Sequence, residues 1–304
     1  MNLKILLLQP VKGIKVPVHF YALAAMLFWG MSFVWTSILL VHFQPVTIIF
    51  IRLLISSAFL FLLMIVSGRF ERIRREDTWL LLGSAVFNPF LYFLGENFGV
   101  KLTSATISSV IIATIPVFSP LIAWLTFREK ISRLNIFGIF VSFSGVAIML
   151  ASRDLSFSGE GKGVLFLFGA VFSALVFSVF LKKLTQKYSP VTLVAWQNIL
   201  GALMFLPVFL VFESNRISAV HLNYEIVSSF LFLSVFASSL AFVFFAKTVK
   251  EIGISKANIY SNLIPVFTAF FSYFLIAEPF TIQKISGIIL VVGGVYLSER
   301  NKPR

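Results

Sequence analysis

The sequence predicts an all-α integral membrane protein, with ten transmembrane helices arranged as two inverted five-helix repeats. Three observations support this fold class. Of the 304 residues, 59% are apolar and only 12% are charged, whereas about a quarter of the residues of a soluble domain are charged. The mean hydropathy is +0.97. Long apolar segments follow one another through the chain, and the first half of the sequence resembles the second.

The apolar segments define the expected helices, since a transmembrane helix needs about 20 mostly apolar residues. Ten segments qualify, and they cover residues 19–41, 45–67, 78–98, 103–126, 134–151, 162–181, 190–212, 226–246, 254–277 and 282–298. The gaps between them are too short for a separate soluble domain. Residues 1–18 lack a small-residue cleavage site, so we interpret them as a cytoplasmic arm and not as a removed signal peptide.

Basic residues predict the orientation, because Lys and Arg accumulate on the cytoplasmic side of a membrane protein. With the N-terminus in the cytoplasm, the cytoplasmic segments contain 19 Lys and Arg residues and the opposite side contains 5. The arm 1–18 and the tail 299–304 are then both cytoplasmic. We expect a multi-pass protein with the lipid bilayer as its surroundings.

An internal duplication divides the chain into a first repeat, 19–151, and a second repeat, 162–298. Segment 103–150 aligns without gaps on 252–299 at an offset of 149 residues. The matched positions include Pro116 with Pro265, Glu129 with Glu278, Gly138 with Gly287 and Gly145 with Gly294. Apolar composition alone does not place proline, glutamate and glycine in register.

The duplication is predicted to be inverted. Each half holds five spans, and an odd number makes equivalent helices cross the membrane in opposite directions. The charges agree, because Arg128, Lys130 and Arg133 have the uncharged counterparts Ala277, Pro279 and Ile282. Equivalent loops therefore exchange their charge, as loops on opposite sides of a membrane would.

Motifs spread over all ten segments resemble those of the drug/metabolite transporter superfamily, in its EamA-type branch. They include Trp29-Gly30, the Pro45-x6-Arg52 start of the second segment and Thr103-Ser104-Ala105. The paired Pro-Val-Phe…Glu runs and the closing Gly-x6-Gly-Val of each half complete the set. The resemblance implies ten helices around a central cavity, the export or exchange of small metabolites, and a location in the plasma (inner) membrane. The chain departs from symmetry, because Gln197 stands where a second copy of Arg52 would be.

Polar residues inside a membrane span are costly and indicate candidate sites. Asn88, Tyr92 and Glu96 are spaced i, i+4 and i+8, and so share one face of segment 78–98. Gly95 and Gly99 beside them would let another helix approach closely. We expect this stripe to bind substrate, with Glu96 as an amine partner or a proton carrier. The alternative places Glu96 among the lipid headgroups.

Arg52 lies near the start of segment 45–67, and two interpretations remain open. Its long side chain could extend to the membrane interface, which we favour because the position is shallow. Alternatively, it could pair with Glu96 or with a substrate carboxylate, for which a guanidinium group is well suited.

The segment 254–277 offers Asn258 and Asn262 as further binding residues, followed by Pro265. Proline removes a backbone hydrogen bond and bends a helix. Pro116 is its counterpart in the first repeat, so we predict that the two prolines form hinges. The alternative is that they only shape packing. Trp29 and Trp196 are candidate walls of the substrate site, or interface anchors. Glu129 and Glu278 are interpreted as anchors of helix ends.

The pattern favours a secondary transporter over a membrane-embedded enzyme. The three histidines lie at span ends far apart in the sequence, there is no cysteine, and no metal-binding or ATP-binding motif occurs. We therefore expect no metal, no cofactor, no catalytic residues and no nucleic-acid partner. A non-transporting receptor is disfavoured by the inverted duplication.

The predicted function is the export of small metabolites, with amino acids or related compounds as the leading substrates, by alternating access. Glu96 and Arg52 could bind the two charges of a zwitterion. The alternative substrate is a lipophilic cationic drug, which would need only Glu96 and aromatic walls. The sequence leaves open the coupling ion, and also whether the chain acts alone or as a homodimer.

Overall fold

A computed structural model describes residues 17–68, 70–118, 133–150, 160–215, 221–279 and 281–300. Within these ranges every regular element is helical. Seven of the described helices are long and apolar enough to cross a membrane, and three shorter apolar helices cover Ala105–Phe118, Ile136–Ile148 and Ile282–Leu297. The protein is therefore a multi-span membrane protein by helix length and composition, and the count of ten spans stays a prediction.

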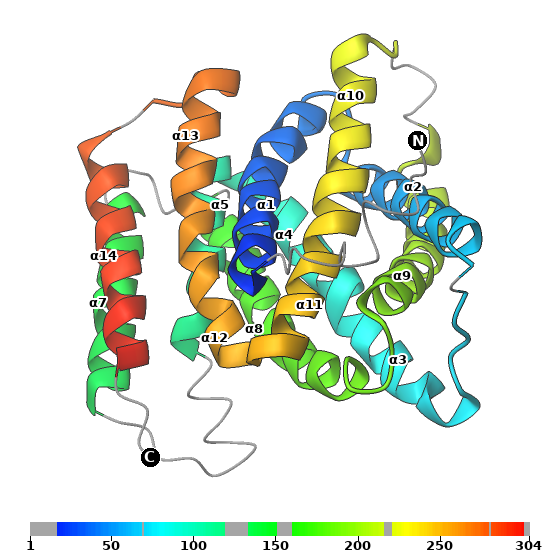
Figure 1. The fold of residues 1–304 in the computed structure, drawn as a ribbon. Helices are drawn as coiled ribbons and strands as arrows, with labels where there is room; N and C mark the ends of the chain where they lie inside the picture. The colour runs from blue at the N-terminus through cyan, green and yellow to red at the C-terminus, as the bar shows by residue number, and fades with distance from the viewer. Residues whose placement is uncertain are drawn as a thin grey trace.

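The first repeat contains α1 (Val18–Leu40), α2 (Pro45–Val66), η1 (Arg75–Asp77), α3 (Thr78–Ala85), η2 (Val86–Leu91), α4 (Tyr92–Leu102), α5 (Ala105–Ile112) and α7 (Arg133–Leu150). The second repeat contains α8 (Glu160–Leu184), α9 (Pro190–Phe212), α10 (Tyr224–Phe232), η4 (Leu233–Ala241), α11 (Phe242–Ile252), α12 (Ile254–Ile259), η5 (Tyr260–Leu263), α13 (Ile264–Ile276) and α14 (Ile282–Arg300). Figure 1 shows α7 beside α14 at one edge of the molecule and α2 beside α9 toward the other.

The last helices of the two repeats, α7 and α14, pack against each other through their repeated glycines. A Cβ atom at Gly145 would lie 2.7 Å from the carbonyl oxygen of Gly287, and one at Gly294 would lie 2.6 Å from that of Gly138. Residue numbers thus rise along α7 as they fall along α14, so the helices are antiparallel. An inverted duplication requires this arrangement of equivalent helices.

Glycines also set the approach of α4 to α8. A Cβ atom at Gly95 would lie 2.5 Å from the carbonyl oxygen of Phe166. A Cβ atom at Gly99 would lie equally close to the side chain of Leu167. The predicted close contact at this glycine pair is therefore confirmed, and its partner is α8.

The third span of each repeat is irregular: the first repeat has a kink within η2, and the second repeat has the π-helical segment η4. In η2 the cause is Pro89, because the residue before a proline is driven out of the helical region. Asn88 accordingly has φ −147° and ψ 117°. The predicted continuous helix over 78–98 is wrong in this respect.

Breaks also occur at the two predicted hinge prolines. The chain turns at Ala113–Thr114 before the short helix that contains Pro116, and η5 separates α12 from Pro265 at the start of α13. Each proline therefore begins a helix, where its missing N–H costs nothing, instead of bending the middle of one. Whether these breaks move during transport stays a prediction.

Candidate functional site

A buried ion pair joins α2 and α4, the two helices of the first repeat that carry the predicted charged residues. Arg52 on α2 and Glu96 on α4 are 1% and 7% exposed, and Arg52 Nη1 lies 3.7 Å from Glu96 Oε2. Each of these two atoms is buried and has no hydrogen-bond partner. The pair is therefore held by charge attraction, with hydrogen-bonding capacity left over on both sides.

Two neighbours on α4 complete the surroundings of the pair. The Tyr92 hydroxyl donates to Glu96 Oε1 at 3.3 Å, as the i, i+4 spacing allows. The guanidinium carbon of Arg52 lies 4.0 Å from the centre of the Phe93 ring, a cation–π contact. Tyr92, Phe93 and Glu96 are all buried. One turn of α4 thus provides a carboxylate and an aromatic face to Arg52, and a hydroxyl to the carboxylate.

The structure corrects the favoured interpretation of Arg52. Its side chain is among the largest that are fully buried, so it does not extend to the membrane interface. Glu96 is likewise buried inside the protein, and so does not lie among the headgroups. The reason is the packing around α2, which contacts α4, α9 and η4 and encloses even a position close to the helix start.

Aromatic side chains extend from this pair to Trp29. The ring centres of Trp29 and Phe242 are 4.9 Å apart, those of Trp29 and Phe245 are 5.0 Å apart, and those of Phe93 and Phe242 are 5.9 Å apart. The indole nitrogen of Trp29 is buried without a hydrogen-bond partner. Phe242 thus links Trp29 to the ring on which Arg52 rests.

On α9, the predicted wall residue Trp196 has aromatic surroundings, whereas its neighbours Gln197 and Asn198 have polar ones. Trp196 contacts Phe61 of α2 edge to face, with ring centres 5.3 Å apart, and its indole nitrogen is also buried without a partner. Gln197 and Asn198 are both buried, and Gln197 donates to the Ser84 hydroxyl at 2.6 Å. Trp196 therefore lies at the α2–α9 contact.

Three predicted binding residues belong to other elements. Asn88 is buried in η2, and its backbone departs from the stripe that the sequence predicted with Tyr92 and Glu96. Asn258 in α12 and Asn262 in η5 are buried at the break before α13. The side-chain oxygen of Asn262 has no hydrogen-bond partner. Asn258 and Asn262 thus provide polar groups at the predicted hinge of the second repeat, apart from Asn88 in η2.

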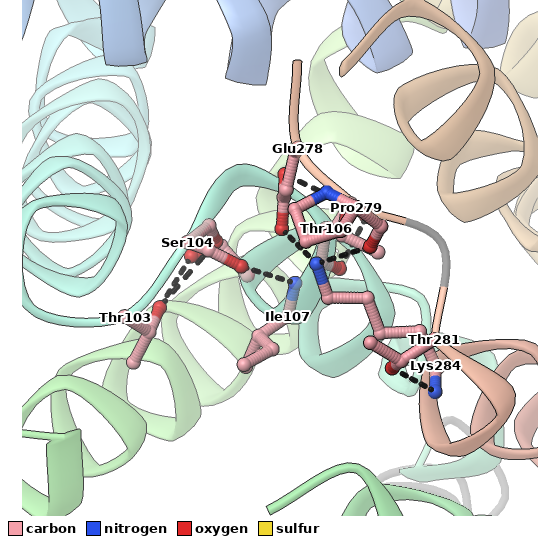
Figure 2. Close-up of polar contacts among 10 residues, drawn as sticks. Thr103, Ser104, Thr106, Ile107, Glu278, Pro279, Thr281 and Lys284 are labelled. Atoms are coloured by element: carbon pink, nitrogen blue, oxygen red, sulfur yellow. Dashed lines mark hydrogen bonds and ion pairs between the residues drawn. The ribbon is translucent and has the colours of Figure 1, made fainter. Parts of the chain in front are cut away.

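Glu278 anchors the corner between α13 and α14, as predicted (Figure 2). Its Oε1 accepts from Lys284 Nζ at 2.8 Å, and its Oε2 accepts from the Thr106 hydroxyl of α5 at 3.0 Å. Thr281 caps α14 by accepting from the Lys284 N–H at 3.3 Å. Partial burial alone would raise the pKa of Glu278. The hydrogen bonds from Lys284, Ser104 and Thr106 outweigh this effect, so the pKa of Glu278 is lowered. Glu129 lies outside the described residues.

Two carboxylates that sequence reasoning missed hold helix starts across the repeats. Glu213, after α9, accepts from the N–H and hydroxyl of Thr47 at 2.6 and 2.7 Å, at the start of α2. Glu71, after α2, accepts from the Thr192 hydroxyl at 2.8 Å and the Ser189 N–H at 3.0 Å, at the start of α9. The shared Pro-Val-Thr at both helix starts was the available signal, because the first N–H groups of a helix need acceptors.

Comparison with known proteins identifies the family. The EamA-like transporter family matches the chain twice, over residues 16–151 and 161–300. The chain belongs to the EamA-like transporter family. As an EamA-family member it is a membrane transporter. Within the described parts of the chain, no group of three or more His, Cys, Asp or Glu residues is placed to hold a metal ion.

Relatives of this EamA-family chain are named as transporters without a stated substrate. An uncharacterized transporter of Archaeoglobus fulgidus is 25% identical over 275 residues, covering 90% of this chain and 96% of the relative. The uncharacterized transporter YvbV of Bacillus subtilis is 28% identical, with coverage of 88% and 87%. A crystal structure with 15% identity matches 92% of this chain and 97% of its own with a TM-score of 0.68, which shows a shared fold.

Proposed function

We propose that this transporter is a secondary exporter of small zwitterionic metabolites, amino acids or related compounds, and that it works by alternating access. The observation that carries the proposal is the buried pair of Arg52 and Glu96, with one unpartnered atom on each side chain. A zwitterion offers a carboxylate to the guanidinium and an ammonium to the carboxylate, both as charge-assisted hydrogen bonds.

The cost of the pair supports a role in binding. Charged side chains inside a membrane are expensive, and replacing a buried ion pair by apolar residues is often neutral or stabilising. Apolar side chains at positions 52 and 96 would therefore be enough to stabilise the fold, so the presence of Arg52 and Glu96 needs a reason other than stability. Exchange of their mutual contact for contacts with a charged substrate is such a reason.

The aromatic neighbours favour a substrate with an apolar part. Trp29, Phe242 and Phe93 form a continuous series of rings beside the pair. Such rings bind apolar or cationic groups on their faces. A lipophilic cation that uses Glu96 and these rings is the second candidate, and it would have no use for Arg52.

Gradients would drive the export, since the sequence has no ATP-binding motif. The repeated breaks before Pro116 and Pro265 are suited to opening the site to one side at a time. The distribution of basic residues supports an orientation with both termini in the cytoplasm, and the family resemblance supports a plasma-membrane location. These features are the expectations of an inverted-repeat transporter.

The test is efflux from liposomes that contain the purified protein. They are loaded in turn with a panel of amino acids and with ethidium as the organic cation, with and without a pH gradient. We expect saturable amino-acid efflux that falls about tenfold or more in Glu96→Gln and in Arg52→Lys. The first variant loses the negative charge that binds the ammonium, and the second loses the planar fork that binds the carboxylate at two points. Gln197→Leu, the counterpart of Arg52 in the other repeat, is the matched control.

Three outcomes would count against the proposal. Efflux of ethidium alone would select the cation exporter. Amino-acid efflux with unchanged rate and pH dependence in Glu96→Gln would remove the carboxylate from the mechanism. Silence on the whole panel would place the substrate outside the proposed class.

A further inference from the structure

Arg52 is oriented by a residue of the other repeat. Its Nε donates to the hydroxyl of Ser238, in η4, at 2.8 Å. The guanidinium carbon lies over the Phe93 ring, and Nη1 lies toward Glu96. Because the guanidinium is planar and rigid, fixing its Nε direction and one of its faces also fixes where the two terminal nitrogens point.

Ser238 is itself held in place by Asn198 of α9. The Asn198 amide donates to the carbonyl oxygen of Ser238 at 3.0 Å and to the hydroxyl of Ser56 at 2.6 Å. Ser56 in turn shares a 2.6 Å hydrogen bond with Ser239. All four side chains are at most 4% exposed. The support of Arg52 thus combines residues from α2, α9 and η4.

The π-helical geometry of η4 makes this support available. Its wider turn is seen in the Ser239 hydroxyl, which donates at 2.9 Å to the carbonyl of Ser234, five residues earlier. Ser238 and Ser239 are both fully buried and both bond to residues of α2. In a membrane interior such polar groups need partners, and here Arg52 is one of them.

The equivalent position in the other repeat is neutral. Gln197, the counterpart of Arg52, donates to Ser84 in α3, which belongs to the third span of the first repeat. Each second helix therefore bonds through an equivalent residue to a serine of the other repeat's third span. Of these two contacts only Arg52–Ser238 includes a charge, so of these two serines only Ser238 orients a charged group.

We propose that Ser238, held by Asn198, is a positioning residue that sets specificity for a substrate carboxylate by directing the terminal nitrogens of Arg52 toward the binding position beside Glu96. The inference rests on the proposed function and deepens it. Without the Ser238 hydroxyl, Arg52 keeps its charge and its aromatic contact but can rotate about its long side chain. Recognition of the carboxylate then weakens while recognition of the amine does not.

The test compares Ser238→Ala with Ser84→Ala, which removes the buried hydroxyl that accepts from Gln197 in the neutral contact. Leucine is the efflux probe, provided that the wild type exports it. For Ser238→Ala we expect the KM to rise about tenfold while the maximal rate stays within about twofold, because one charge-assisted hydrogen bond is lost in binding. Ser84→Ala should leave both parameters unchanged.

Two leucine analogues separate the charges. Thermal stabilisation of the purified protein is measured with 3-methylbutylamine, which lacks the carboxylate, and with 4-methylpentanoate, which lacks the amine. Ser238→Ala should lose stabilisation by the acid and keep stabilisation by the amine. Ser238→Thr, which retains a hydroxyl, should restore both binding and KM, and Asn198→Ala should shift KM in the same direction as Ser238→Ala by a smaller factor.

The failures are distinguishable. A wild type that exports leucine, with the same KM in Ser238→Ala as in Ser84→Ala, overturns the role of Ser238 and leaves the proposed function standing. Equal losses for the acid and the amine assign Ser238 to general stability and overturn its positioning role. A wild type that exports no member of the amino-acid panel overturns the proposed function, and the positioning role with it.

Discussion

The second helix of each repeat donates a hydrogen bond from the same position to a serine in the third span of the other repeat, but only one of the two donors is charged. In the first repeat Arg52 donates to Ser238, and in the second Gln197 donates to Ser84. Both donors occupy the same position of the second helix, 145 residues apart. The comparison shows that both second helices bond across the repeats from this position, while the charge that we propose binds substrate is confined to one half.

A second pair of contacts shows the same relation. Glu213 holds the start of α2, and Glu71 holds the start of α9, each from the opposite repeat. Glu213 is buried at 8% exposure, whereas Glu71 is half-buried. The two carboxylates therefore make the same kind of contact with a helix start, but one is buried and the other is half-buried. Variants of each pair test whether the halves are energetically as different as they are chemically.

The largest effect is expected from making the two halves alike at the charged position. Arg52→Gln leaves Glu96 buried and unpaired, which should lower the free energy of unfolding by about 3–5 kcal/mol. Gln197→Leu leaves only the neutral Ser84 hydroxyl unpaired and should cost about 1–3 kcal/mol. Denaturant titration of the purified protein in detergent measures both.

The double variant Arg52→Gln with Glu96→Gln is the control for this comparison. Because it removes both charges, it should recover much of the stability that Arg52→Gln loses. Equal losses in Arg52→Gln and Gln197→Leu would contradict an energetic difference between the halves.

A smaller and symmetric effect is expected at the crossing of α7 and α14. Gly145→Ala and Gly294→Ala each force a Cβ atom against a backbone carbonyl of the facing helix, and each should cost about 1–3 kcal/mol. Gly293→Ala is the matched control, since nothing lies within 4 Å of its added Cβ. Thermal unfolding measures all three. A loss confined to one of the two contact glycines would show that the halves also differ here.

The smallest effect concerns the two carboxylates. Loss of a helix-capping contact costs about 0.5–2 kcal/mol, and we expect Glu213→Gln to lie at the upper end and Glu71→Gln at the lower end. Partial burial raises the pKa of Glu71, but bonds from Ser189 and Thr192 outweigh it and lower that pKa. The contribution of Glu71 is thus fully present above its unfolded pKa of about 4.3, and is lost as pH falls through the lower folded value.

Stability measured from pH 7 to pH 3 checks this sign. The difference between the wild type and Glu71→Gln should be constant near neutral pH and should shrink in acid. A difference that grows as the pH falls would contradict the assignment of the Glu71 contacts to its ionised form.

The fold was largely predictable, and the site only in part. The repeated prolines, the paired glycines and the membrane spans are readable because backbone constraints and apolar length are local properties. The η2 break was missed although Pro89 is visible in the sequence. Glu71 and Glu213 were missed because each cap joins a loop of one repeat to a helix start of the other, and no spacing within one segment reports such a contact.

The membrane setting, the duplication and the few polar residues inside the spans can all be read from the amino-acid sequence. The choice between the two interpretations of Arg52 required the packed helices, which bury this residue against Glu96. The sequence left this choice open because the helices are apolar on nearly all sides. Since lipid and neighbouring helices are both apolar, hydrophobic pattern cannot tell an inward face from an outward one. Packing at the glycines and at the helix starts makes that choice.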